Sequence, residues 1–559
     1  MSDLLNAKKL FENGIKEFNK KKFILAKQSF KDALEFAPER ISILENLALV
    51  YFIINEFEDS EKILKKIKTL GGYTKKSFEM MINTLRKQGK ISELKNFIEE
   101  ESKKNKLDQK YQVLKEFLYP DFFNNNQEIT SSRKDLINSI EKLEKNENIK
   151  LDLDTQIIDP PIFNLSYDQY ENLEVNKRIV NIYRKFYPEL NNSNIVKKSN
   201  NKIRIGFASE YFTTHTIGKL YIGLILKLSK EKFDIHIFHS NKTKPSFLHS
   251  KFLNAEFSHN ITNHTLPESF KEKVHLIKNQ NLDILFFPEI GMSNEFYFLS
   301  YVRFCKNQIT SWGHPMTTGN DTIDFFLSSK LLEKENSQKK YSEKLILSDF
   351  LPMYFYKPVL KNKLEDQELS KQNIYFCAQT LIKIHPDFDE ILKKILQNDK
   401  KAKIIFIKDD NEVIAKKLIL RFKKTITSNL ERINFVDKMN INDYINYCGK
   451  ASVLLDPLYF GAGNSFHESM YYGTPTVTMP TDNMKSRIVL GAYSQMKIQD
   501  PPIVNSIDDY VSSAIKIANL ESNTLVETKK YYRKCAEKNL FENEGFIIDL
   551  ENIFLKLVN

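Results

Sequence analysis

The most constraining feature of this sequence is a double series of short apolar runs that begins near residue 202. Each run has the length of a buried strand, and stretches of helical periodicity separate the runs. Strands that alternate with helices predict a doubly wound α/β sheet, and two such sheets form a cleft that binds ligands at the strand C-termini. We therefore expect two α/β lobes, residues 201–360 and 361–559. The predicted strands are Ile203–Ala208, Phe233–Phe238, Leu282–Phe287, Gln308–Trp312 and Thr322–Ser328 in the first lobe, and Ile374–Cys377, Ala402–Ile407, Ile433–Val436, Val453–Asp456 and Thr476–Thr478 in the second.

A different periodicity governs the residues ahead of these lobes. Small and aromatic residues and a proline recur at the spacing of the tetratricopeptide repeat, which is roughly 34 residues long. The sequence therefore predicts helical repeats over residues 1–110 and a helical connector over 111–200. Such a stack either presents a concave surface to a polypeptide or only buttresses the next domain. The matching residues of the first copy are Gly14, Phe23, Ala26, Phe30, Ala33 and Pro38.

Composition places the chain among ordinary globular proteins. The formal charge is +11, but lysines are spread along the chain and interleaved with acids, which favours a solvated surface over a nucleic-acid-binding stripe. The four cysteines are widely scattered, as in a reduced intracellular protein. The sequence has neither a signal peptide nor an apolar run of the ~18 residues that cross a membrane. We expect a cytoplasmic protein that binds neither nucleic acid nor a membrane.

The segment Leu455–Pro480 has the pattern of an anion-binding site. A strand ends at Asp456, a loop with Gly461 and Gly463 follows, and a helix opens at Asn464. Glycines allow backbone N–H groups to approach a ligand, and a helix start favours an anion, so the segment suits a diphosphate. An ordinary capped helix would show the same pattern. The spacing is not that of a Rossmann dehydrogenase or a P-loop, so neither of those classes is favoured.

This segment and four others, in the same order, resemble the O-linked N-acetylglucosamine transferase and SPINDLY family, and most of all its bacterial SPINDLY-like branch. The likeness covers about residues 202–559, and the helical repeats fit because this family carries them ahead of its transferase. The resemblance implies a GT-B fold of two Rossmann-like lobes, a nucleotide-sugar donor, and inversion at the anomeric carbon without a metal. It also implies Ser or Thr hydroxyls of proteins as acceptors. The four other segments are Ile203–Leu220, Leu282–Met292, Gln308–Phe326 and Phe376–Phe388.

The resemblance further implies two catalytic residues. His215 matches the active-site histidine of the family, which either takes a proton from the acceptor hydroxyl or orients the acceptor. Lys383 matches the lysine that faces the donor diphosphate. Negative charge grows on the phosphate as the sugar leaves, and a fixed ammonium stabilises that charge most in the transition state.

The remaining site residues are expected to bind the donor. Asn464 and Ser465 match the phosphate-binding pair of the family, and Glu468 matches an acid that holds the ribose. The family has His where this chain has Gly463, so the identity of the donor stays open. The full donor-binding set that we expect is Gly461, Gly463, Asn464, Ser465, Glu468 and, from a loop that lines the cleft, Gly313 and His314.

Together these features predict a protein O-glycosyltransferase that uses UDP-N-acetylglucosamine and needs no metal or other cofactor. UDP-glucose, GDP-fucose and a non-protein acceptor remain alternatives within the class. The alternative from another class is a non-catalytic tetratricopeptide scaffold with a degenerate α/β body.

Overall fold

The chain packs as two compact units. The computed structural model describes residues 2–104, 107–191, 202–244, 246, 250, 261–365 and 373–558. One unit comprises Met1–Phe122 with Asn411–Val413, and the other comprises Phe123–Asp410 with Ile414–Asn559. The domain boundary expected between residues 200 and 201 lies outside the described residues.

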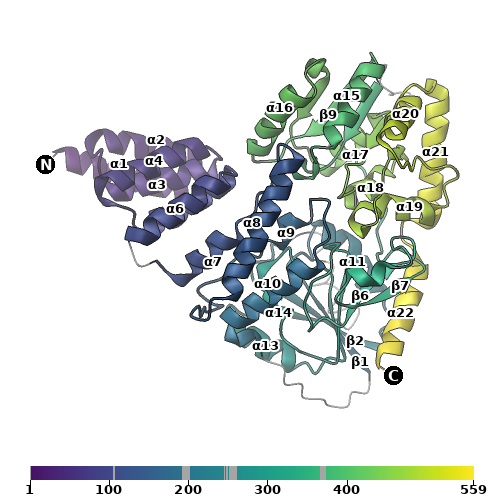
Figure 1. Ribbon diagram of the computed structural model, residues 1–559, viewed down its shortest axis with the longest axis horizontal. Coiled ribbons are helices and arrows are strands. Elements are labelled where there is room, and N and C mark those ends of the chain that lie inside the picture. The colour runs from purple at the N-terminus through teal and green to yellow at the C-terminus, as the bar shows by residue number, and fades with distance from the viewer. Residues whose placement is uncertain are drawn as a thin grey trace. The chain divides into compact units, whose positions relative to one another are not determined.

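The first unit is built of helices, as the repeat pattern predicts (Figure 1). Helices α1 and α2 pack closely because Gly14 faces Phe30: a Cβ at Gly14 would lie 2.5 Å from the Phe30 ring. Phe30 and Ala33 are fully buried between the helices. The helices are α1 (Ser2–Asn19), α2 (Phe23–Phe36), α3 (Ile41–Ile53), α4 (Phe57–Gly71), α5 (Lys75–Lys87), α6 (Ile91–Lys104) and α7 (Gln109–Phe117).

The first lobe of the second unit contains a seven-stranded sheet with the order β3-β2-β1-β4-β5-β6-β7. All its neighbouring strands run parallel. Five strands lie where the apolar runs predict them, whereas the two edge strands, β3 and β7, were not predicted: β3 is mostly polar, and the apolar run of β7 is only three residues long. The strands are β1 (Ile203–Ala208), β2 (Phe233–Ser240), β3 (Ile261–Leu266), β4 (Ile284–Phe287), β5 (Asn307–Ser311), β6 (Phe325–Ser329) and β7 (Lys344–Ser348), with helices α11 (Thr216–Lys227), α13 (Phe270–Lys278) and α14 (Asn294–Leu299).

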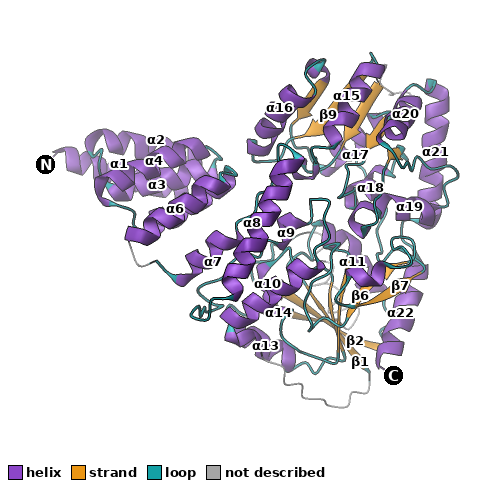
Figure 2. Cartoon of the chain, in the orientation of Figure 1, coloured by secondary structure: helices purple, strands orange, loops and turns teal. Residues whose placement is uncertain are grey.

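The second lobe contains a five-stranded parallel sheet with the order β10-β9-β8-β11-β12 (Figure 2). All five predicted strands are present. The prediction of a helical repeat followed by two doubly wound α/β lobes is therefore confirmed. The strands are β8 (Asn373–Cys377), β9 (Ala402–Ile407), β10 (Ile433–Val436), β11 (Val453–Leu455) and β12 (Thr476–Val477), and the helices are α15 (Phe388–Asn398), α16 (Val413–Thr425), α17 (Ile441–Lys450), α18 (Asn464–Ser469), α19 (Ile488–Met496), α20 (Ile507–Ala518), α21 (Ser522–Asn539) and α22 (Glu544–Val558).

Helix α22 follows the second lobe in sequence but packs on the sheet of the first. Its Phe554 is fully buried, with its ring 6.1 Å from that of Phe233 and 6.4 Å from that of Phe207. Glu551 accepts hydrogen bonds from the backbone N–H of Ser229 at 2.8 Å and from Lys232 Nζ at 2.7 Å. The two lobes therefore share a core through this helix.

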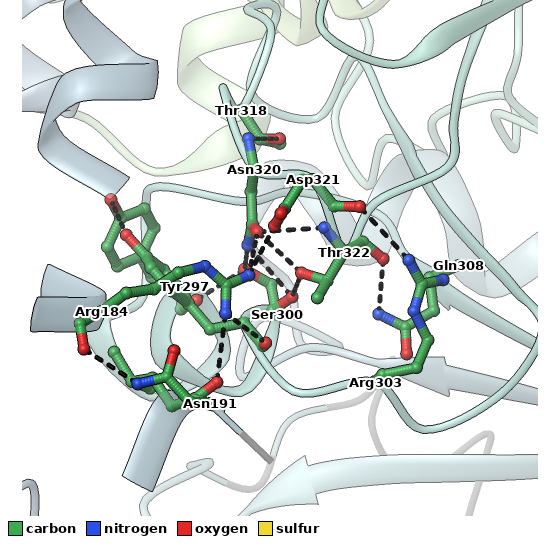
Figure 3. A network of polar contacts seen from close by, with 12 residues as sticks. Arg184, Asn191, Tyr297, Ser300, Arg303, Gln308, Thr318, Asn320, Asp321 and Thr322 are labelled. Carbon is green, nitrogen blue, oxygen red and sulfur yellow. Dashed lines mark hydrogen bonds and ion pairs between the residues drawn. The ribbon is translucent and has the colours of Figure 1, made fainter. Parts of the chain in front are cut away.

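A polar network fastens the connector to the first lobe (Figure 3). The connector contributes α8 (Asn126–Glu144), α9 (Ile162–Leu165) and α10 (Leu173–Phe186). Arg184 of α10 donates to Asn320 Oδ1 at 3.1 Å and to Asp321 Oδ1 at 2.6 Å. Asn320 Nδ2 in turn donates to the carbonyl of Ser300 at 3.1 Å.

No described helix combines the length and the hydrophobicity that a membrane span requires.

Candidate active site

His215 stands at the start of α11, beyond the C-terminal end of β1. Its Nδ1 caps the helix by accepting the backbone N–H of Ile217 at 3.3 Å, and its ring stacks on Tyr211 with centroids 4.5 Å apart. Burial lowers the pKa of His215 to about 4, and the charge of Lys219 acts in the same direction. The ring is therefore neutral at pH 7. Since Nδ1 accepts a hydrogen bond, the proton resides on Nε2, so this tautomer favours orientation of a substrate over removal of its proton.

The glycine loop folds around a buried carboxyl group. Asp456 follows β11, and its two oxygens accept the backbone N–H of Ala462 at 2.6 Å and the hydroxyl of Thr478 at 2.7 Å. Burial raises the pKa of Asp456 to about 7. A Cβ at Gly461 would lie 2.9 Å from Asp456 Oδ2, so the loop requires glycine there. A Cβ at Gly463 would meet only a methyl group at 3.9 Å, so packing leaves room for a side chain at that position.

Lys383 reaches this loop from a short 3-10 turn, Leu381–Lys383, that follows β8. Its Nζ donates to the carbonyl of Gly461 at 3.1 Å and to Gln379 Oε1 at 3.0 Å. The ammonium also lies 4.5 Å from the centroid of the Phe460 ring. Burial lowers the pKa of Lys383 to about 8, and the carboxylate of Asp456 opposes that shift. The lysine is therefore a desolvated cation beside the glycine loop.

The donor-binding residues expected on α18 lie next to this lysine. Gln379 Nε2 donates to Ser465 Oγ at 2.5 Å, which connects Ser465 to Lys383 through one side chain. Asn464 Nδ2 donates to Glu468 Oε1 at 2.8 Å. No described residue donates to Asn464 Oδ1, although that atom is buried. A buried acceptor of this kind normally has a partner, so Asn464 Oδ1 is a candidate acceptor for a hydrogen bond from a ligand.

Two further residues, which the sequence pattern did not single out, belong to the site. Gln379 connects Lys383 to Ser465, and Lys219 Nζ pairs with Glu468 Oε1 from across the cleft. Lys219 follows the N-cap residue His215 by four residues, one turn into α11, so a helix that begins at His215 would have indicated its position. Nothing in the local sequence indicates Gln379.

Gly313 and His314 are placed differently. A Cβ at Gly313 would lie 2.4 Å from the carbonyl of Pro288 and 2.7 Å from the side chain of Ile217, so Gly313 supports the start of α11. The His314 side chain is buried, 4% exposed, and its ring stacks on Phe163 of the connector with centroids 6.0 Å apart. Burial lowers its pKa to about 4. Gly313 packs within the first lobe and His314 contacts the connector, and their roles in donor binding stay predictions.

The arrangement suits an anionic ligand that also bears hydroxyl groups. Lys383 supplies a cation, Ser465 and Asn464 supply hydrogen-bonding groups, and Glu468 supplies a carboxylate within one helical turn. Within the described ranges, no three His, Cys, Asp or Glu side chains form a group that could hold a metal ion.

Comparison with known proteins places the chain among glycosyltransferases. No model of a known protein family matches it. It is 24% identical over 290 residues to the UDP-glucose:protein N-beta-glucosyltransferase of Actinobacillus pleuropneumoniae serotype 5b, which covers 50% of this chain and 44% of that protein. It is 21% identical over 377 residues to the probable UDP-N-acetylglucosamine–peptide N-acetylglucosaminyltransferase SEC of Arabidopsis thaliana, which covers 64% of this chain and 37% of that protein. The chain thus spans less than half the length of either relative.

The fold comparison extends over the whole chain. The structure of a mutant O-GlcNAc transferase from Thermobaculum terrenum superposes with a TM-score of 0.71 at 15% sequence identity and covers 100% of this chain and 98% of that one. This likeness confirms the expected fold, tetratricopeptide-like helices ahead of a GT-B pair of lobes. In sequence and in fold, the chain resembles glycosyltransferases of the O-linked N-acetylglucosamine transferase and SPINDLY type.

Proposed function

We propose that this protein transfers N-acetylglucosamine from UDP-N-acetylglucosamine to Ser or Thr hydroxyls of a protein, with inversion and without a metal. The observation that carries the proposal is the cluster around the glycine loop, in which Lys383, Ser465, Asn464 and Glu468 meet. A desolvated ammonium beside hydrogen-bonding side chains fits a diphosphate, and a carboxylate one turn further fits ribose hydroxyls.

In the proposed reaction the acceptor oxygen attacks the anomeric carbon from the face opposite the diphosphate. The bond between that carbon and the phosphate oxygen breaks, and its electron pair stays on the diphosphate. Lys383 stabilises this growing charge without reorganisation because its ammonium is already fixed beside the loop. The hydroxyl proton passes to a phosphate oxygen or to water. His215 carries its proton on Nε2 and orients the reacting groups.

UDP-glucose is the second candidate donor, because the Actinobacillus relative is named as a UDP-glucose:protein N-beta-glucosyltransferase. The structure bears on this choice at Gly463, where packing leaves space for a larger residue. The absence of a side chain at Gly463 is compatible with either donor sugar.

The test is a panel of UDP- and GDP-sugars, measured for binding by calorimetry and for transfer to a mixture of Ser-, Thr- and Asn-containing peptides by mass spectrometry. We expect UDP-sugars to bind and UDP-N-acetylglucosamine to be transferred to hydroxyl-bearing peptides. Transfer of glucose to an Asn-containing peptide would favour the second candidate. Absence of heat with every UDP and GDP compound would support the scaffold alternative and would overturn the proposal.

A further inference from the structure

An ion pair crosses the cleft between the two lobes. Lys219 of α11, in the first lobe, donates from Nζ to Glu468 Oε1 of α18, in the second. Glu468 is buried, with 6% of its surface exposed, whereas the Lys219 side chain is 26% exposed. Lys219 is therefore partly accessible to solvent, whereas the carboxylate of Glu468 is almost inaccessible.

The pair balances a charge that would otherwise oppose donor binding. Glu468 lies one helical turn from Asn464, which donates to the same Oε1 atom. A buried carboxylate without a cation is strongly unfavourable and would repel an incoming diphosphate. With Lys219 in place the negative charge of Glu468 is compensated, and the positive charge of Lys383 remains available for the phosphates.

Lys219 also lies one turn after His215 on α11. Its backbone N–H donates to the His215 carbonyl at 3.1 Å in the first turn of the helix. The titratable groups around His215 are Tyr211, stacked on its ring, Lys219, and, through Lys219, Glu468 of the second lobe. The positive charge of Lys219 disfavours a second positive charge on the imidazole of His215, so Lys219 helps to keep the His215 ring neutral.

We propose that Lys219 is a positioning residue of the donor site, which neutralises Glu468 and holds the His215 end of α11 against the second lobe. This role deepens the proposed function and rests on it for its consequence in nucleotide binding. Donor binding then meets a carboxylate that is already compensated and a histidine that is already neutral.

The first experiment is a double-mutant cycle read by calorimetric titration with UDP and with GDP. Lys219→Met removes the charge at similar side-chain length, and we expect it to weaken nucleotide binding about tenfold. Lys219→Arg keeps the charge and should stay within a few-fold of wild type. Glu468→Gln and the double variant Lys219→Met/Glu468→Gln complete the cycle, and the loss in the double variant should be smaller than the sum of the two single losses. Unchanged binding in Lys219→Met, or strictly additive effects in the cycle, would overturn the proposal.

The second experiment needs no nucleotide and separates this proposal from the proposed function. The pKa of His215 is followed by NMR of ring-labelled histidine in the nucleotide-free protein, with His215→Asn used to assign the signal. We expect His215 to titrate at a higher pH in Lys219→Met than in wild type, and Lys219→Arg to restore the wild-type value. Identical titration in all three proteins would refute the role of Lys219. Absence of UDP and GDP binding by wild type, with the His215 shift present, would refute the proposed function alone.

Discussion

Replacement of Lys383 by methionine should separate activity from stability. Methionine is unbranched and of similar length, so it retains contact with Phe460 while it removes the ammonium. Loss of one group that stabilises charge in a transition state costs roughly 100- to 1,000-fold in turnover. We therefore expect Lys383→Met to lose sugar transfer by about that factor.

The same substitution should stabilise the folded protein. The pKa of Lys383 falls from an ordinary value of 10.5 to about 8 on burial, which corresponds to about 3 kcal/mol against the charged lysine at neutral pH. The two hydrogen bonds that the ammonium donates offset about 1 kcal/mol each. The net gain for methionine at pH 7 is then about 1 kcal/mol.

The pH dependence of stability tests independently whether burial of the charged lysine destabilises the folded protein. The folded-state pKa lies below the unfolded one, so wild type carries the full penalty below pH 8 and gains stability as the pH rises from 8 toward 10.5. The advantage of Lys383→Met should therefore vanish at about pH 9 and reverse at higher pH.

The assay is urea unfolding followed by the fluorescence of Trp312, the single tryptophan, which is buried in the first lobe. The matched control is Lys529→Met, because Lys529 is also buried and donates to the carbonyls of Gly449 and Ala451 at 2.7 and 2.6 Å, away from the glycine loop. It should retain turnover within a few-fold. A Lys383→Met protein that is less stable than wild type at pH 7, or that keeps turnover within tenfold, would refute the reasoning.

Two further predictions concern stability alone. Arg421 is 2% exposed and makes two hydrogen bonds to the carboxylate of Asp389, so Arg421→Met should destabilise the protein by about 3–5 kcal/mol, because it leaves a buried charge; chemical unfolding measures this, and a loss below 1 kcal/mol would contradict it. Gly313→Ala should lower the thermal unfolding midpoint, at a cost of about 1–3 kcal/mol, because the new Cβ would lie 2.4 Å from the carbonyl of Pro288; an unchanged midpoint would show that close packing does not require glycine there.

The sequence predicted every strand of the second sheet, including its edge strands β10 and β12, and missed only the two edge strands of the first sheet. Strands β1 and β9 have the predicted bounds because they are buried among neighbours and carry continuous apolar runs. Strands β3 and β7 form the two edges of the first sheet, and their residues are partly exposed. In β3 only the two end residues are apolar, so hydrophobic patterning alone did not detect it.

The contacts of the candidate site likewise include some that the sequence predicts and some that it does not. Asn464, Ser465 and Glu468 lie on one short helix, so their proximity follows from local sequence. The pairing of Lys219 with Glu468 joins residues 249 positions apart and depends on how the two lobes close. Contacts of this kind are set by tertiary packing, and no local pattern predicts them.

The position of α22 constrains the order in which the protein is made and folded. The phenylalanine side chains of β1 and β2 are covered by a helix that is translated only after the whole second lobe. During synthesis the first sheet therefore waits with an uncovered apolar face while the ribosome completes some three hundred further residues, about the span from β2 to α22. A premature stop codon after Asn543 would remove α22 and so leave uncovered the apolar face of the half of the protein that was translated first.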